Sequence, residues 1–404
     1  MNIVDELKAR GFVAQISHEE ALYEYLETPG VFYIGFDPTA DSLHAGHLFQ
    51  MILMAHMQRA GHRPIALLGG GTGMVGDPSD RTDMRAVLSP DVIEHNVSRF
   101  RDQMSLLLDF SAGRAIVENN ASWLLPLNYV QFLREIGAVF SVNKMLTAEA
   151  YRQRLEKGLT FLEFNYMLMQ AYDFLELYRR HNCRLQIGGN DQWSNILAGV
   201  DLVRRKEQAE VYALTTNLLV TSTGQKMGKT AKGALWLDGE KTPPYEFYQY
   251  WRNVDDESVD SLLKRLTFLP LDEIEDLTSV SGSAINEAKR RLALELTEMV
   301  HGEAAAQQAD QTAAALFAGA GSAENMETYR LTDADQGAAL IDVLTAAGLF
   351  PSKSEGRRLI RQGGVTLNGE KISDTSFALT EDCFADGEAI VKKGKKNYLK
   401  LLWP

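Results

Sequence analysis

The apolar positions in the first part of the chain follow two different periods. Val31–Phe36 is a short run of apolar, aromatic and β-branched residues that ends at Asp37-Pro38. Leu43–Arg59 then carries apolar residues at helical spacing and stops at Gly61, after which Pro64–Leu68 is a second apolar run. A strand, a helix and a strand in this order predict a βαβ unit, and therefore a parallel sheet.

The pattern then changes twice before the sheet is complete. Residues 92 to about 183 are mostly helical in spacing and are predicted to be a helical insertion. Arg184–Ile187 resumes as a strand, and Trp193–Arg205 follows as a helix. We therefore predict an α/β fold for residues 1–233, a Rossmann-like doubly wound parallel sheet with a helical insertion, which binds its ligand where the strand order reverses.

The rest of the chain predicts two further domains. Residues 234–320 carry amphipathic helical patterns and predict an α-helical domain. The segment 321–337, which follows a Gly, Ala and Ser stretch, predicts a linker. Residues 338–404 contain helical patterns at Leu340–Ala347 and Ser354–Arg361, followed by short strands between glycines, which predicts a small α+β domain.

Composition and charge fit a folded protein with one distinctive end. The 404 residues are 45% hydrophobic and 24% charged, so about two to four domains are expected. Cys183 and Cys383 are too few for a disulfide framework, and no apolar run is long enough for export or for a membrane span, so we expect a cytoplasmic protein. The net charge is −13, yet residues 338–404 carry 10 Lys and Arg against 8 Asp and Glu, which makes this end the candidate for contact with a polyanion.

The segment after the first predicted strand carries two histidines at a position suited to nucleotide binding. His44 and His47 are three residues apart at the start of the predicted helix, where they share one face at the positive end of the helix dipole. Gly46 lies between them and leaves room for a flat base. Two surface histidines on an ordinary helix are the alternative, but the strand–turn–helix context favours phosphate binding.

A second candidate segment, Lys226-Met227-Gly228-Lys229-Thr230, lies in a loop rich in Gly, Ser and Thr. Its two lysines are spaced to reach different oxygens of one polyphosphate. By itself the segment is typical of a solvated basic turn. Together with the histidine pair, it resembles the two signature motifs of class I aminoacyl-tRNA synthetases.

Longer stretches resemble the tyrosyl-tRNA synthetases of bacterial type in particular, over nearly the whole chain. They are Tyr33–Thr39, Gly76–Ser79, Met169–Phe174, Gln186–Trp193 and Lys226–Thr230. Three residues depart from the usual family pattern. Ala45 stands where a larger aliphatic residue is usual, Asn190 where a serine is usual, and Arg81 where a lysine is usual, so they affect fine positioning.

One motif points to a different class of enzyme. Gly71-Thr72-Gly73-Met74-Val75-Gly76 matches the dinucleotide fingerprint G-x-G-x-x-G and follows a predicted strand. The third glycine of that fingerprint lies inside a helix, but here Asp77-Pro78 follows it, and proline disfavours helical geometry at the residue before it. The resemblance instead implies a loop that presents Asp77 to the substrate amino group.

A polar stripe marks a predicted helix from Phe161 to Leu177. Tyr166, Gln170 and Asp173 fall at i, i+4 and i+7 among residues that are apolar on all sides, so the stripe is predicted to line a pocket. The alternative is that the stripe faces water.

The resemblance implies the reaction and its partners. An enzyme of this family activates L-tyrosine with ATP to tyrosyl-adenylate and pyrophosphate, and then transfers tyrosine to the 3′-terminal ribose of tRNA(Tyr). It implies ATP as a substrate accompanied by Mg²⁺, no tightly bound cofactor, no metal site in the protein, no membrane and a homodimer.

The same resemblance implies the site residues. The expected catalytic residues are Thr39, His44, His47, Arg81, Arg85, Lys226, Lys229 and Thr230. Tyrosine is expected to contact Tyr33, Asp77, Tyr166, Gln170, Asp173 and Gln192, with Tyr33 and Asp173 at the phenolic hydroxyl. ATP is expected to contact Gly35, Asp37, Thr39, His44, Gly46, His47, Gly189, Asp191, Leu218, Lys226 and Lys229.

Several alternatives stay open at this point. Asp191 is a candidate for the ribose diol, but it is also a candidate helix N-cap. Arg357, Arg358 and Arg361 are expected to bind RNA phosphates, although a solvated helix face explains the same charges. A tryptophan-specific relative, a simpler nucleotidyltransferase and a non-catalytic RNA-binding protein are the competing functions.

Overall fold

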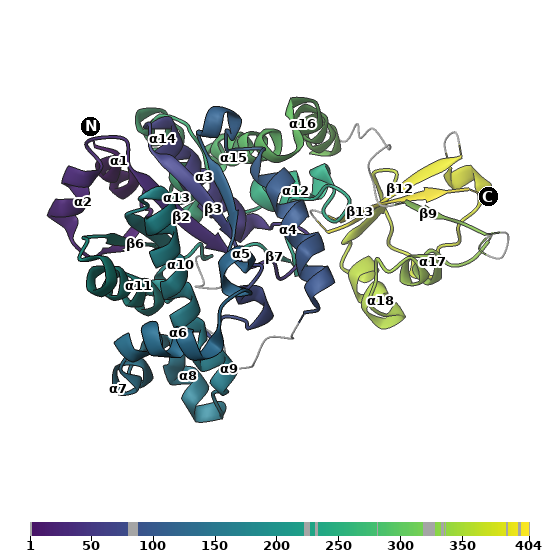
Figure 1. Cartoon of the computed structure of the whole chain (residues 1–404). Coiled ribbons are helices and arrows are strands. Elements are labelled where there is room, and N and C mark those ends of the chain that lie inside the picture. Colours follow the sequence, from purple (N-terminus) through teal and green to yellow (C-terminus); the bar gives the residue numbers. More distant parts are fainter. Residues whose placement is uncertain are drawn as a thin grey trace. The chain divides into compact units, whose positions relative to one another are not determined.

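The computed structural model describes most of the chain (Figure 1). The described residues are 2–79, 88–221, 227–230, 233–280, 282–317, 328–332, 335, 337–384, 387–394 and 397–403. The chain divides into two compact units, Met1–Ala306 and Gln307–Pro404, and each is considered by itself. No helix of the described part has the length and the apolar character needed to cross a membrane.

A six-stranded sheet forms the centre of the first unit. Its strands are β1 (Val13–Ile16), β2 (Val31–Phe36), β3 (Arg63–Leu68), β4 (Ile116–Asn119), β5 (Leu185–Gly189) and β6 (Tyr212–Thr216). The spatial order is β1-β6-β5-β2-β3-β4, and every neighbouring pair is parallel except β1 with β6. The predicted doubly wound sheet is confirmed, and its order reverses between β2 and β5.

Continuous apolar runs explain why the central strands lie where they do. β2 and β3 pair in register over six residues, from Val31 opposite Arg63 to Phe36 opposite Leu68. Almost all of their side chains are buried, as expected for parallel strands covered on both faces. α3 (Ala45–Arg59) contacts β2 and β3, and α11 (Trp193–Glu207) contacts β5 and β6, so the βαβ unit predicted from the sequence is present.

Helices occupy most of the range predicted to be a helical insertion. They are α4 (Pro90–Met104), α5 (Ala121–Leu124), α6 (Tyr129–Glu135), α7 (Val142–Leu146), α8 (Glu149–Lys157), α9 (Phe161–Phe164) and α10 (Tyr166–His181). The prediction missed β4, which lies inside this range and pairs with β3. β4 has only four residues, and two of them, Glu118 and Asn119, are polar, so no apolar run marks it.

The helix predicted over Phe161–Leu177 is two helices. α9 ends at Phe164, and Asn165 precedes α10. Thr160 caps α9 through the backbone N–H of Glu163. The Glu163 carboxylate in turn is buried against the guanidinium of Arg154, with Nε–Oε1 and Nη2–Oε2 distances of 3.0 Å. This buried ion pair fixes the start of α9, the short helix that directly precedes the helix carrying the polar stripe.

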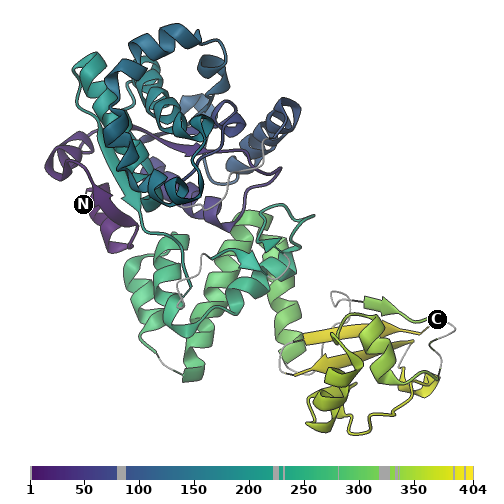
Figure 2. The same cartoon turned by 90° about the horizontal axis from the view of Figure 1, so that it is seen from below.

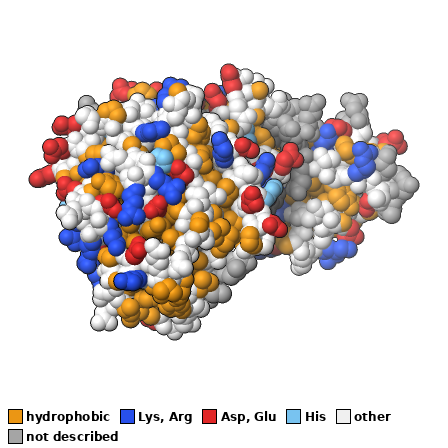
Figure 3. Space-filling view, in the orientation of Figure 1, with side chains coloured by type: hydrophobic (Ala, Val, Ile, Leu, Met, Phe, Trp, Pro, Cys, Tyr) orange, Lys and Arg blue, Asp and Glu red, His pale blue; other side chains and the backbone are white. Residues whose placement is uncertain are grey.

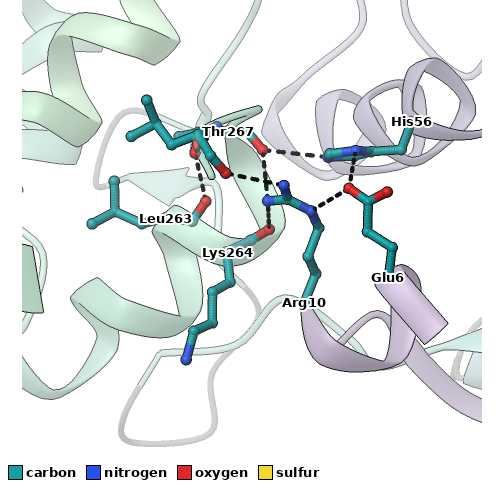
Figure 4. A network of polar contacts seen from close by, with 7 residues as sticks. Glu6, Arg10, His56, Leu263, Lys264 and Thr267 are labelled. Atoms are coloured by element: carbon teal, nitrogen blue, oxygen red, sulfur yellow. Dashed lines mark hydrogen bonds and ion pairs between the residues drawn. The ribbon is translucent and has the colours of Figure 1, made fainter. Parts of the chain in front are cut away.

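The helical part of the first unit is joined to the N-terminal helices by a buried polar network (Figure 4). α1 (Ile3–Ala9) precedes the sheet and α2 (Glu19–Tyr25) follows its first strand, while α12 (Pro244–Arg252), α13 (Val259–Leu266), α14 (Leu271–Thr278) and α15 (Ile285–His301) come after its last strand. The boundary between the two units falls within α16 (Glu303–Phe317). Arg10 donates to the carbonyls of Lys264 and Thr267 and to the Glu6 carboxylate. His56 of α3 contacts both Glu6 and Thr267, and burial, helped by Arg10, lowers the pKa of His56 to about 4. This network places α13 at the end of α3.

The second unit is a small α+β fold, as the sequence predicts. Its elements are β9 (Thr328–Arg330), α17 (Leu340–Ala346), α18 (Lys353–Arg361), β10 (Val365–Leu367), β11 (Glu370–Lys371), β12 (Glu388–Lys393) and β13 (Asn397–Leu402). The sheet order is β11-β10-β12-β13-β9, and Figure 2 shows α17 and α18 beside the strands. β9 lies within the range predicted to be a linker, and it pairs in parallel with β13.

Candidate active site

The predicted site residues converge on one cavity of about 390 Å³ at the point where the strand order reverses. The lining residues come from the carboxyl ends of β2 and β5, from the start of α3 and from α10. Predicted residues that line it are Tyr33, Gly35, Asp37, Thr39, His44, Gly46, His47, Asp77, Tyr166, Gln170, Asp173, Gly189, Asp191, Gln192 and Leu218. A larger cavity of about 850 Å³ shares Asp191 and Leu218 with this site and extends to α13.

Five predicted catalytic residues cannot be placed in this way. Arg81, Arg85 and Lys226 lie outside the described residues. Lys229 and Thr230 form the short strand β7 (Lys229–Thr230), which pairs with β8 (Gly233–Ala234), but their side chains are not described.

The two histidines at the start of α3 are held in one tautomer by their own backbone. His44 is the N-cap of α3, and its Nδ1 accepts a hydrogen bond from the N–H of Gly46 at 3.1 Å. The Nδ1 of His47 accepts from the N–H of His44 at 3.2 Å, and the rings stack with their centroids 3.9 Å apart. Because both Nδ1 atoms are acceptors, each neutral ring carries its proton on Nε2. Both rings therefore present an N–H donor at the positive end of the helix.

Two carboxylates of the cavity are held in place by neighbouring donors. Asp37 accepts from the hydroxyl of Tyr166 at 3.0 Å and from the hydroxyl of Thr72 at 2.9 Å. Asp77 accepts from the amide of Gln192 at 2.6 Å and also from a backbone N–H. Ionised carboxylates beside a cavity attract a cationic group such as an ammonium.

Asp173 lies at the buried end of the cavity. It is 2% exposed, and its two oxygens accept hydrogen bonds from the amide of Asn120 at 2.9 Å and the indole N–H of Trp123 at 2.7 Å. Burial raises its pKa to about 7, while these two hydrogen bonds oppose the shift. Tyr33 is equally buried, burial raises the pKa of its phenol well above the ordinary value, and its hydroxyl has no hydrogen-bond partner among the described residues. The pair thus offers a buried acceptor and a buried hydroxyl to one ligand group.

Asn120 and Trp123 are the site residues that sequence reasoning missed. Besides Asp173, the amide of Asn120 donates to the hydroxyl of Thr72 at 2.9 Å, and its oxygen accepts from the N–H of Gly71 at 2.7 Å. Through Thr72, this chain of hydrogen bonds joins Asp173 to Asp37, and both carboxylates line the cavity. Both missed residues follow β4, so the only sequence signal was a polar residue directly after a strand that had not been predicted.

The backbone geometry of residues 71–76 contradicts the alternative that this motif binds a dinucleotide. Thr72–Met74 is a single 3₁₀ turn, and Gly76 has a φ of +86°, which no helix interior allows. The N-cap alternative for Asp191 is also wrong, because Gln192 occupies that position of α11 without a side-chain cap. The Asp191 carboxylate instead lies over Gly189, where a Cβ would come within 2.4 Å of its Oδ1.

Residues 26–318 match the family described as tRNA synthetases class I (W and Y), and residues 320–401 match the Tyrosine--tRNA ligase SYY-like C-terminal domain. The Tyrosine--tRNA ligase of Clostridium beijerinckii is 58% identical over 401 residues, which is 99% of each chain. That of Clostridium perfringens strain 13 is 57% identical over 402 residues, with the same coverage. The chain belongs to the tyrosyl-tRNA synthetases.

Solved structures agree with the assignment. A C-terminally truncated mitochondrial tyrosyl-tRNA synthetase of Aspergillus nidulans has a TM-score of 0.70 and 29% identity, and the match covers 78% of this chain and 94% of that one. The Archaeoglobus fulgidus tyrosyl-tRNA synthetase, complexed with L-tyrosine, has a TM-score of 0.60 at 19% identity and covers 76% of this chain and 100% of that one, which supports the fold. The predicted fold and family are therefore confirmed.

The basic residues of the second unit differ in their exposure. Arg357, Arg358 and Arg361 of α18 are all exposed. Lys400, in contrast, is 8% exposed and pairs with Glu388 across β12 and β13, so it is not available to a polyanion. Lys393 donates to the carbonyl of Leu349 and packs over Phe350, which also directs it inward.

Proposed function

We propose that the cavity between β2 and β5 binds tyrosine and ATP together, forms tyrosyl-adenylate and then passes tyrosine to the 3′-terminal ribose of tRNA(Tyr). The observation that carries this proposal is that one cavity is lined both by the buried Tyr33 and Asp173 and by His44 and His47 at the start of α3. The family of the chain activates an amino acid with ATP, and this arrangement supplies one end for each substrate.

The tyrosine end is selective for a hydroxyl group. We assign the phenolic hydroxyl of the substrate to Asp173, which accepts a hydrogen bond from it, and to Tyr33, which donates a hydrogen bond to its oxygen. Without that hydroxyl, both buried groups would lose a partner, at a cost of roughly 1–3 kcal/mol each. At the opposite end of the bound amino acid, the buried Oε1 of Gln170 has no partner among the described residues and can accept from the substrate ammonium beside Asp77 and Tyr166.

Activation needs no general base, because the substrate carboxylate is ionised at neutral pH. This carboxylate attacks the α-phosphorus of ATP, the bond to the β-phosphate oxygen breaks, and pyrophosphate leaves with the electron pair. The enzyme contributes positioning and charge stabilisation. His44 and His47 donate from Nε2 to phosphate oxygens, with Thr39 beside them.

The remaining predicted site residues are assigned to the other parts of ATP. Lys226, Lys229, Thr230, Arg81 and Arg85 are assigned to the leaving pyrophosphate, and Asp191 with Gly189 to the ribose of ATP. Mg²⁺ enters with the ATP phosphates as part of the substrate. In the part of the chain that the structure describes, no group of three or more His, Cys, Asp or Glu side chains is placed to hold a metal ion.

Pyrophosphate exchange into ATP, run separately with each amino acid, tests the assignment. We expect fast exchange with tyrosine alone, because Tyr33 and Asp173 require a hydroxyl partner that phenylalanine and tryptophan lack. Exchange with either of those two amino acids at the rate seen with tyrosine would contradict the specificity. Absence of exchange with every amino acid would contradict the activity itself.

We assign tRNA binding in part to the second unit. The exposure of the arginines of α18 supports contact with phosphates, and so does the match of residues 320–401 to the C-terminal domain of tyrosine–tRNA ligases. Reduced Cys183 and Cys383 and a role in protein synthesis support a cytoplasmic location.

A second copy of the chain is the proposed partner for an apolar surface of the first unit. Exposed apolar side chains are frequent from α5 to α9, among them Leu125 at 59%, Tyr129 at 61%, Val130 at 72%, Val142 at 55% and Phe161 at 67%. Figure 3 shows hydrophobic side chains over the region where Figure 1 labels α8 and α9. A patch of this kind marks an interaction surface, and the family likeness favours a homodimer.

Phe161→Asp is expected to convert the dimer to monomers at micromolar concentration, because it places a charge within the apolar patch. Sedimentation velocity measures the change. Val280→Asp is the matched control, since Val280 is 42% exposed on the helical part and lies outside the patch. If the wild type sediments as a monomer, or if both variants behave alike, the patch is not the dimer surface.

A further inference from the structure

We propose that the hydroxyl of Tyr250, on α12, is a positioning group for the Lys226–Thr230 motif during activation of tyrosine. The inference rests on the proposed function, in which that motif acts on the pyrophosphate. It concerns Gly228, the central residue of the motif, whose backbone contacts the structure describes.

Gly228 is fixed on three sides. Its N–H donates to the Tyr250 hydroxyl at 2.8 Å, and its carbonyl accepts from the N–H of Leu235 at 2.7 Å. On the third side it lies against Ala45, because a Cβ at position 228 would come within 2.9 Å of the Ala45 Cβ. Its φ of +83° is in the left-handed region, which favours glycine. A residue held in this way sets the direction in which the chain leaves on both sides.

A backbone ladder connects Gly228 to the histidines. The carbonyl of Leu235, whose N–H bonds Gly228, accepts from the N–H of Ala45 at 2.9 Å. One residue further, Trp236 forms a β-bridge with His44, and the N–H of Leu237 donates to the carbonyl of Leu43. Gly228 is thereby held in register with the first turn of α3, which presents the Nε2 donors of the histidines.

Tyr250 adds the contact from the helical part of the unit. Its ring is half-buried and lies edge-on to Trp251, with centroids 5.0 Å apart, so the hydroxyl has a fixed position. Burial raises the pKa of Tyr250, which keeps the phenol neutral at physiological pH. The carbonyl of Gly228 is bonded to Leu235, which is itself bonded to the first turn of α3. The N–H of Gly228 is bonded to Tyr250, which belongs to α12.

The position of Gly228 matters more for the activation of tyrosine than for the transfer of tyrosine to tRNA. Lys226 and Lys229 flank it, and their assigned ligand is the pyrophosphate, which is present during activation and absent during transfer to tRNA. A displacement of about 1 Å can cost on the order of a hundredfold in rate when a group must meet developing charge. A loosened Gly228 should therefore slow activation and leave transfer unchanged.

Tyr250→Phe removes the acceptor and keeps the ring. We expect kcat for pyrophosphate exchange to fall about tenfold, since the loss of one buried hydrogen bond of this kind is of that order. KM for tyrosine and the single-turnover rate of transfer from preformed tyrosyl-adenylate to tRNA should stay at wild-type values. Tyr23→Phe is the control, because it also removes one tyrosine hydroxyl, but one that donates to Asp5 of α1 at 2.7 Å instead of accepting from Gly228.

Two outcomes would overturn the inference. One is exchange by Tyr250→Phe at the wild-type rate. The other is an equal loss in exchange, in KM for tyrosine and in transfer, which would indicate a general structural defect. Neither outcome touches the proposed function, which fails only if the wild-type enzyme itself does not exchange pyrophosphate with tyrosine.

Discussion

Asp173→Ala is expected to lower kcat/KM for tyrosine in pyrophosphate exchange by about a thousandfold while the protein stays folded. The substitution removes the acceptor for the substrate hydroxyl and leaves the amide of Asn120 and the indole of Trp123 without their bond to Asp173. Those two unpaired donors lower the stability of the fold, whereas kcat/KM falls because bound tyrosine loses a hydrogen bond to a charged group, roughly 1.5–3 kcal/mol, and keeps an unsatisfied buried hydroxyl, roughly 1–3 kcal/mol. About 4 kcal/mol corresponds to a thousandfold change in rate. The effect should appear in the second-order constant for tyrosine, measured by exchange at limiting tyrosine.

Glu176→Gln provides the matched control for this variant. Glu176 is on the same helix, pairs with Arg179 and Arg180 and does not line the cavity. It should keep the wild-type constant, and both variants should have native circular dichroism. An active Asp173→Ala enzyme would mean that Asp173 does not contact the substrate.

The pH dependence of tyrosine capture distinguishes a substrate contact from a packing role. Because burial holds the pKa of Asp173 at about 7 in the empty site, part of the enzyme is protonated there at neutral pH. The ionised form is the one that accepts from the phenol, so kcat/KM for tyrosine should rise with pH through about 7 and level off above it. Asp173→Asn, which has no proton to lose, should be less active and should lack this step.

The pattern of apolar residues in the sequence was sufficient to predict the central elements β2, α3 and β3. Val31–Phe36 was predicted as a strand with the bounds that β2 has, and the following helix and strand were predicted within two residues of α3 and β3. In each case an apolar run or an apolar pattern of helical spacing is bounded by a residue that breaks it, so sequence-local forces decide the structure. The cavity followed from these elements, because a doubly wound sheet binds its ligand where its strand order reverses.

Short elements held by distant partners were not predictable in the same way. β4 has four half-buried residues and exists because it pairs with β3, about 50 residues away in sequence. β9 similarly pairs with β13 from within a predicted linker. Asn120 and Trp123 belong to the site only because β4 brings them to Asp173, so missing the strand meant missing both residues.

The finer chemistry of the motifs also depends on the folded backbone. The spacing of His44 and His47 predicts a shared helix face, but not that each Nδ1 is already used as an acceptor, which settles the tautomers. Likewise, the basic motif predicts phosphate contact, whereas the anchoring of Gly228 requires Tyr250, which is 22 residues further along. Such contacts follow from tertiary structure and have no pattern of their own.

A chain that ends near Ala323 is expected to form tyrosyl-adenylate at the full-length rate and to charge tRNA poorly, by about a hundredfold or more at physiological salt. The groups assigned to activation lie between Tyr33 and Thr230, inside the unit Met1–Ala306. The cut falls after the first family match, which ends at residue 318, and close to the start of the second match at residue 320. It also falls before β9, the first strand of the second unit. The removed part is nearly neutral, with 11 Lys and Arg against 12 Asp and Glu, and carries the exposed arginines of α18, while the residues that remain carry 30 Lys and Arg against 42 Asp and Glu, a net charge of −12. An acidic body should hold RNA weakly without it.

Salt dependence tests whether the lost charging comes from phosphate contacts. Each phosphate that a protein neutralises releases counterions, so charging by the full-length enzyme should weaken with added salt more steeply than exchange does. Arg357→Ala, Arg358→Ala and Arg361→Ala combined in the full-length chain should reproduce part of the loss and reduce the salt slope. Lys400→Met should not, because Lys400 is buried against Glu388. If the shortened enzyme charges tRNA at the full-length rate with an equal salt slope, the second unit does not bind the tRNA.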